Sequence, residues 1–116
     1  MAGKDSLGFV ETIGLVTAVE VADAMSKAAS VSIRMVANAD AGLISVVCEG
    51  DLASCMAAVD AGKAAGGALG QVVATNLIAR PDNSLDGYLS QQVPCIVERR
   101  STAPSKTGKE KSKKNE

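Results

Sequence analysis

The segment that most constrains the fold is residues 31–50, VSIRMVANADAGLISVVCEG. Its two runs rich in Val and Ile, 31–36 and 43–49, suit the pleated and half-buried surface of β-strands. The bend between them, 37–42, contains Asn, Asp and Gly, which tolerate left-handed backbone angles and favour turns. The segment therefore predicts a β-hairpin, and a helix-like segment and a further strand lie on each side of it.

The chain before the hairpin predicts one strand and one helix. Residues 7–13 alternate as a strand does, with apolar side chains on both faces. Residues 15–29 place small and apolar side chains along one stripe of a helix. The other side of this helix carries Glu20, Asp23 and Lys27. Because Asp23 and Lys27 are four residues apart, they can form a weak ion pair.

The chain after the hairpin repeats this pattern in reverse. Asp51 is a suitable N-cap for a helix over residues 52–65, and Gly66 and Gly67 are a suitable stop for it. Residues 71–78 predict the fourth strand. Two shorter elements follow, a helical turn within 83–89 and an extended segment at 93–97.

The resulting order, β-α-β-β-α-β, is the split β-α-β pattern of the ferredoxin-like class. It predicts an α+β fold with an antiparallel sheet and both helices on one face. The extended segment or a partner would be needed to cover the other face. We expect an N-terminal arm at 1–5, one domain at 6–90 with a short helix at its C-terminal end, and an extension at 91–116 whose tail is disordered.

Charge is distributed unevenly along the chain. Residues 1–97 contain five basic and ten acidic side chains, whereas residues 98–116 contain seven basic and three acidic ones. The basic tail would suit a nucleic-acid arm that acts through counterion release, or a solubilising or partner-binding extension. We prefer the second interpretation and expect no nucleic-acid partner, because the acidic domain offers no continuous basic surface and has one Phe, one Tyr and no Trp for base stacking.

The residue types also argue against catalysis. The chain has no His, which is the commonest general base and metal ligand. We find no nucleophile paired with a base and no pair of carboxylates placed for acid–base chemistry. We therefore expect no enzyme activity, no catalytic residue, no metal and no cofactor. No apolar run approaches the ~20 residues that span a membrane, and the N-terminus has no apolar signal core, so we expect a cytoplasmic protein without a membrane partner.

Two further motifs have ordinary structural interpretations. Cys48, Cys55 and Cys95 lack CxxC spacing, and we interpret Cys48 and Cys55 as small buried side chains rather than redox groups or cluster ligands. The glycine-rich segment 65–70, AGGALG, lacks the Lys and hydroxyl of a phosphate-binding loop and precedes a strand. It is better interpreted as a helix-to-strand connection.

Four short motifs together resemble the single-domain hexameric shell proteins of bacterial microcompartments. In order and spacing they cover residues 6–90. They are LG-VET-G in the first strand, ADAM-KAA in the first helix, EGD followed by DAG-AA in the second helix, and I-RP after the fourth strand.

This resemblance implies a structural protein of the microcompartment shell. Six copies would form a flat disc, and discs would tile edge to edge around encapsulated enzymes, with a central pore for small metabolites. The implied partners are other copies of the chain, other shell proteins and the encapsulated enzymes. By the resemblance, Lys27 and Arg80 fall at the hexamer–hexamer interface. The residues themselves also allow simpler roles, an ion pair with Asp23 and a surface charge after a strand.

The resemblance assigns the pore lining to the hairpin bend. The matching residues are Asn38, Ala39, Asp40, Ala41 and Gly42. They differ from the family's usual Gly-Ser-Gly turn, because a hydroxyl is absent and an acid replaces a glycine. Asp40 would either form a ring of carboxylates that favours cations and neutral polar molecules, or stabilise the turn while Ala41 and backbone N–H groups line the hole.

One alternative function belongs to a different class. A ferredoxin-like regulatory protein that binds a small ligand would also oligomerise. It would require a cleft with convergent polar groups, which would distinguish it from a shell protein.

Overall fold

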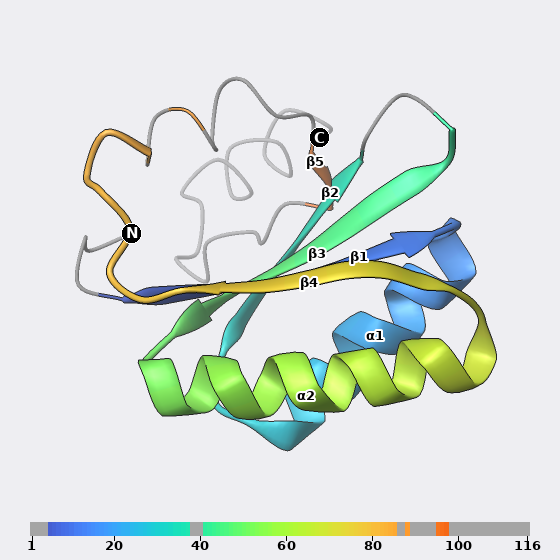
Figure 1. Ribbon diagram of the computed structural model, residues 1–116, viewed down its shortest axis with the longest axis horizontal. Helices are drawn as coiled ribbons and strands as arrows, with labels where there is room; N and C mark the ends of the chain where they lie inside the picture. The colour runs from blue at the N-terminus through green and yellow to red at the C-terminus, as the bar shows by residue number, and fades with distance from the viewer. Residues whose placement is uncertain (1–4, 38–40, 86–87, 89–94, 98–116) are drawn as a thin grey trace, which may run out of the picture.

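The elements follow one another in the predicted β-α-β-β-α-β order (Figure 1). The computed structural model describes residues 5–37, 41–85, 88 and 95–97. The helices are α1 (Leu15–Ala28) and α2 (Leu52–Leu69). The strands are β1 (Ser6–Ile13), β2 (Ser32–Ala37), β3 (Leu43–Gly50), β4 (Val72–Ile78) and β5 (Cys95–Val97).

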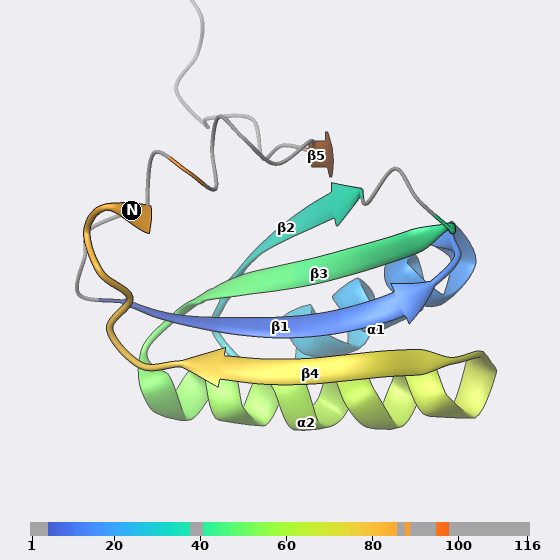
Figure 2. The same cartoon turned by 45° about the horizontal axis from the view of Figure 1, so that its top comes forward.

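The strands form one antiparallel sheet in the order β4-β1-β3-β2-β5. β1 and β3 form its centre, paired from Ser6 opposite Gly50 to Ile13 opposite Leu43. Both helices pack on the same face of the sheet (Figure 2). The predicted α+β fold, with an antiparallel sheet and both helices on one face, is therefore confirmed, and the structure places the hairpin strand β3 at the centre of the sheet.

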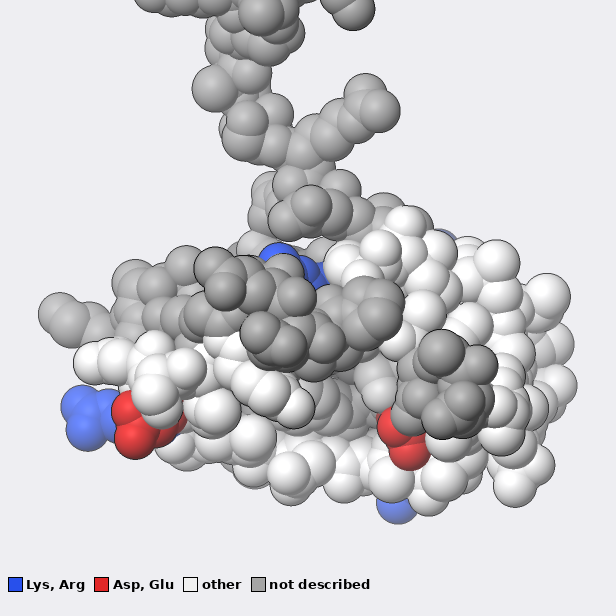
Figure 3. Space-filling model, turned by 90° about the horizontal axis from the view of Figure 1, so that it is seen from above, with Lys and Arg blue, Asp and Glu red and all other residues white. Residues whose placement is uncertain are grey.

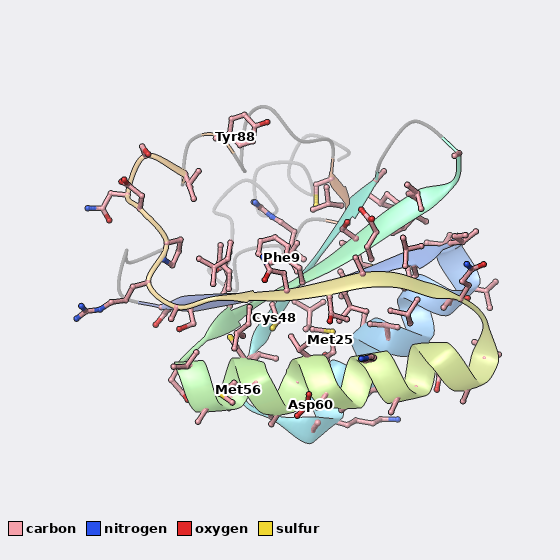
Figure 4. All side chains as sticks on the ribbon, in the orientation of Figure 1. Phe9, Met25, Cys48, Met56, Asp60 and Tyr88 are labelled. Atoms are coloured by element: carbon pink, nitrogen blue, oxygen red, sulfur yellow. The ribbon has the colours of Figure 1, made fainter. Side chains whose placement is uncertain are left out.

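Alternation along the strands divides the apolar side chains between two clusters. Val10 and Cys48 are completely buried beneath the helices, where they join Met25 of α1. Leu7 and Phe9 belong to a smaller cluster on the opposite face of the sheet. Figure 4 shows this division, with Met25 between sheet and helix and Phe9 on the other side. The two-sided apolar pattern predicted for the first strand is thus confirmed.

The second helix begins as predicted and ends later than predicted. The Asp51 carboxylate accepts a hydrogen bond from the Ser54 amide at 2.9 Å, which caps the helix and lowers the pKa of Asp51. The predicted stop at Gly66 and Gly67 is wrong, because α2 continues to Leu69.

Close packing explains Gly66. A Cβ atom at Gly66 would lie 2.7 Å from side-chain atoms of both Val21 and Val72, whereas a Cβ at Gly67 would meet nothing within 4 Å. Gly66 therefore permits α2 to approach α1 and β4. The backbone turns away from the helix at Gly70, whose amide donates to the Gly66 carbonyl at 2.8 Å.

The two short C-terminal elements are described in part. The turn predicted within 83–89 begins with the Leu85 amide, which donates to the Asp82 carbonyl at 3.0 Å, and its later residues lie largely outside the described ranges. The segment predicted at 93–97 contains β5, which pairs with β2 and widens the sheet. Residues 93–94, the arm at 1–4 and the tail at 98–116 lie outside the described residues.

Cys48 of β3 and Cys55 of α2 are buried in the core between the sheet and the helices, which confirms their interpretation as small core side chains. Burial, together with the neighbouring Cys55, raises the pKa of Cys48 to about 12. Burial also raises the pKa of Cys55, whose thiol donates to the Ser6 carbonyl at 3.4 Å. Cys95 is partly exposed, and its thiol donates to the Met35 carbonyl at 2.8 Å.

Substitution of the two adjacent glycines of α2 should have opposite effects. Gly66→Ala would overpack the contact with Val21 and Val72, so we expect the free energy of unfolding to fall by about 1–3 kcal/mol. Gly67→Ala adds a methyl group in open space and should raise it by roughly 0.5–1 kcal/mol, because alanine loses less backbone entropy in a helix. Urea denaturation measures both; equal effects would contradict the packing role of Gly66.

Stability should also fall in alkali through Cys48. Since its folded-state pKa is raised from 9.0 to about 12, the stabilisation is fully present below pH 9 and is lost as the pH rises towards 12. We expect the free energy of unfolding, measured by urea denaturation from pH 7 to pH 11, to decrease above pH 9. The decrease should be smaller in Cys48→Ala, and an unchanged slope in that variant would contradict the assignment to this thiol.

Candidate functional site

Ala41 and Gly42, the described residues of the predicted pore, lie at the opposite end of the sheet from the residues predicted for the tile edge. We call the end at Ile13 and Leu43 the loop end, because the β2–β3 connection is there. We call the end at Ser6 and Gly50 the edge end. α1 starts after β1 at the loop end and leads into β2 at the edge end. β4 also ends at the edge end, where Ile78 lies opposite Leu7.

The described part of the predicted pore loop is exposed and has an unusual backbone. Ala41 and Gly42 have φ angles of 62° and 71°, in the left-handed region that disfavours a Cβ atom. The Gly42 carbonyl accepts a hydrogen bond from the Gly14 amide at 2.9 Å, which ties the loop to the junction of β1 and α1. Asn38, Ala39 and Asp40 lie outside the described residues, so the direction of the Asp40 side chain stays a prediction.

Lys27 lies in the last turn of α1 with its side chain 75% exposed. Its Nζ lies 2.7 Å from Oδ2 of Asp23, whose side chain is 51% exposed. The hydrogen bond to Asp23, and then the charge of Asp23, raise the pKa of Lys27. The predicted ion pair is therefore present, and its exposure leaves Lys27 accessible to a neighbouring molecule.

Arg80 follows β4 and is exposed, while the next residue, Pro81, is buried. Its φ angle is 56°, which is strained for an arginine. Lys27 and Arg80 both belong to the edge end. They are not brought together within one subunit, because α1 leads into β2 and Arg80 follows β4, on the two sides of the central strands.

Exposed apolar side chains surround the loop end, a feature that the sequence analysis did not identify. Val16 is the most exposed of them, at 73%. The others come from the end of β1, the start of α1, the end of α2 and the start of β4; they are Ile13, Leu15, Leu69 and Val73. The sequence does not predict that these side chains are exposed, because each one is next to core positions along the chain.

The described surface also has a shallow groove, of about 320 Å³, between α2 and β4. Met56 and Asp60 of α2 contribute to one side, and Figure 4 shows both on that helix. Thr75, Asn76 and Leu77 form the other side. A single carboxylate in an open groove is a poor match for the converging polar groups of a small-ligand site.

Charged side chains are sparse on one face of the described part of the molecule (Figure 3). On the face in Figure 3, the coloured basic and acidic side chains are few, and at the left end of the view a basic and an acidic group lie against each other. Within the described ranges, no group of three or more His, Cys, Asp or Glu side chains could hold a metal ion. Neither described helix is long and apolar enough to cross a membrane.

Comparison with known proteins identifies the domain. Residues 6–81 match the family model described as the BMC domain. The bacterial microcompartment shell protein EutM of Salmonella typhimurium is 43% identical over 82 residues, which are 71% of this chain and 85% of EutM. The shell protein PduA of Citrobacter freundii is 39% identical over 90 residues, which are 78% of this chain and 97% of PduA.

A solved structure agrees with these relatives. It is a microcompartment protein from Desulfitobacterium hafniense, which matches with a TM-score of 0.66 and 26% identity. The match covers 82% of this chain and 52% of that one, so this chain spans about half the length of the solved protein. The resemblance seen in the four sequence motifs is confirmed, and this chain belongs to the BMC-domain family of bacterial microcompartment shell proteins.

Proposed function

We propose that this chain is a non-catalytic tile of a microcompartment shell. It forms cyclic homohexamers that pack edge to edge into facets, and a pore on the six-fold axis passes small metabolites to and from encapsulated enzymes. The observation that carries the proposal is the separation of the two candidate regions. Ala41 and Gly42 are at the loop end of the sheet, whereas Lys27 and Arg80 belong to its edge end.

A ring requires this kind of polarity in each subunit. One end of the subunit must face the symmetry axis and the other must face outward, towards the neighbouring disc. The exposed apolar side chains around the loop end support the inward direction of that end, because subunits converge near the axis and bury the surfaces that flank the loop. Val16 and Val73 would become buried between neighbouring copies.

The outward end carries the two cations that make the contacts between discs. Arg80 offers a planar guanidinium that can donate to several carbonyl groups across a close, flat edge. Its strained backbone supports this role, because left-handed arginine conformations persist where the surrounding structure imposes them and are concentrated at functional positions. Lys27 provides a second donor, a compact ammonium group.

Two hypotheses remain for the chemistry of the pore. If Asp40 points to the axis, six carboxylates would repel anions and favour cations and neutral polar molecules. If Asp40 stabilises the turn, Ala41 and backbone N–H groups would line the hole. The left-handed angles of Ala41 and Gly42 support a tight turn in both cases.

The tile-edge role of Lys27 is tested by Lys27→Ala. We expect the variant to fold and form hexamers but to lose extended sheets, because a contact made at every disc edge is removed. Size-exclusion chromatography with light scattering measures the hexamer, and negative-stain microscopy reveals the sheets. Lys63→Ala is the matched control, since Lys63 is an exposed lysine on α2. Ordered sheets in Lys27→Ala would contradict the edge role.

The position of the loop can be tested by cross-linking. In a Cys95→Ser background, Ala41→Cys would place one exposed thiol from each subunit close to the axis. A short bis-maleimide should then link subunits into a ladder that extends to six copies on a denaturing gel. Met56→Cys, exposed on α2, is the control for links between discs. A ladder no stronger than that of the control would contradict the placement of the loop at the axis.

A further inference from the structure

The ion pair between Asp23 and Lys27 lies near the C-terminal end of α1, at the edge end of the sheet. The Asp23 carboxylate is one turn before Lys27 and holds its ammonium group at 2.7 Å. The lysine side chain therefore lies back along α1 instead of extending past the helix end. Glu20, the preceding acid of α1, has the smallest effect on Lys27. Asp23 is thus the acid that Lys27 contacts directly within one subunit.

Symmetry makes this negative charge important at the edge. Identical hexamers that tile a plane edge to edge meet across two-fold axes, so the same patch of surface faces itself. A residue near such an axis faces its own copy in the neighbouring disc. If Lys27 lies at this contact, two ammonium groups approach each other, and like charges at an interface oppose association.

We propose that Asp23 is a positioning residue of the tile edge, whose carboxylate holds Lys27 along α1 and neutralises the repulsion between Lys27 side chains of adjacent hexamers. This inference rests on the proposed edge role of Lys27. The sequence allowed two alternative roles for Lys27, an ion pair with Asp23 and a contact at the tile edge. In this proposal Lys27 has both roles at once. Each disc edge then presents paired charges rather than isolated cations.

The same pair should matter little for folding. An exposed ion pair gains little energy in water, because solvent screens it and both side chains lose freedom. An interface between discs excludes part of that water and brings two Lys27 side chains together. Loss of the carboxylate therefore increases the repulsion between discs. Removal of Asp23 should therefore weaken assembly while the isolated hexamer keeps its stability.

The experiment compares Asp23→Asn with the unchanged chain. Sheet formation is followed by light scattering and negative-stain microscopy at low salt and at about 1 M salt, where charges are screened within about 3 Å. At low salt we expect Asp23→Asn to need about tenfold more protein to form sheets. At high salt the difference should largely disappear. Asp23→Glu should assemble nearly as the unchanged chain does, because it restores the carboxylate.

Two controls isolate the effect. Asp60→Asn removes one exposed carboxylate from α2 and should leave assembly unchanged at both salt concentrations. Melting temperatures and hexamer mass, measured for every variant, should match those of the unchanged chain. A defect in Asp23→Asn that is equally large at both salt concentrations would show a structural role and overturn the proposal.

The outcomes also separate this inference from the proposed function. If Asp23→Asn forms sheets like the unchanged chain at low salt while Lys27→Ala does not, the counter-ion role is overturned and the edge role of Lys27 stands. If Lys27→Ala also forms ordered sheets, the edge role of Lys27 and the counter-ion role of Asp23 are both overturned. If Lys27→Ala forms no sheets and Asp23→Asn forms them again at high salt, the two roles are both supported.

Discussion

The close contact of α2 with the sheet and with α1 is the interaction on which the rest of the structure depends. A Cβ atom at Gly8 of β1 would lie 2.6 Å from Val59 and 2.7 Å from the Cys48 thiol, and one at Gly62 would lie 2.8 Å from Met25. The backbones of β1 and α2, and of α2 and α1, therefore approach more closely than larger side chains at these glycines would permit. This packing fixes both helices on one face and leaves the other face of the sheet to a small cluster around Leu7 and Phe9.

The fixed helices give the subunit its polarity. β1 and β3 are eight residues long and fully paired, so the loop end and the edge end are separated by roughly 25 Å at the rise of an extended strand. Because α1 runs back along this length, one rigid body carries the Gly14–Gly42 hydrogen bond at one end and Lys27 at the other. A shell tile needs such a spacer, since its pore and its edges must keep their relative positions.

The two ends of the subunit present different kinds of surface, apolar at the loop end and charged at the edge end. The exposed apolar residues at the loop end suit contacts that bury surface permanently, such as those within a ring. The Asp23–Lys27 pair at the edge end is exposed to solvent and contributes little stability to the isolated subunit. In the proposed assembly it would matter where two copies meet. An assembly built in this way would have stable rings and edges that respond to salt.

Local patterns in the sequence predict the main helices and strands, their order and the family. Alternation in residues 7–13, the Asp51 cap and the Val-rich hairpin strands depend on neighbours in the chain, so local patterns report them well. The choice of candidate residues came from the motifs, and Lys27 with its ion pair followed from helical spacing. The role of Gly66 became clear from the packing of α2, because a glycine that ends a helix and one that admits a neighbouring helix look alike in sequence. The tertiary structure also decided the left-handed backbone of Ala41 and Arg80, the pairing of β5 with β2 and the apolar surface at the loop end. These features arise from contacts between distant segments, which local propensity does not encode.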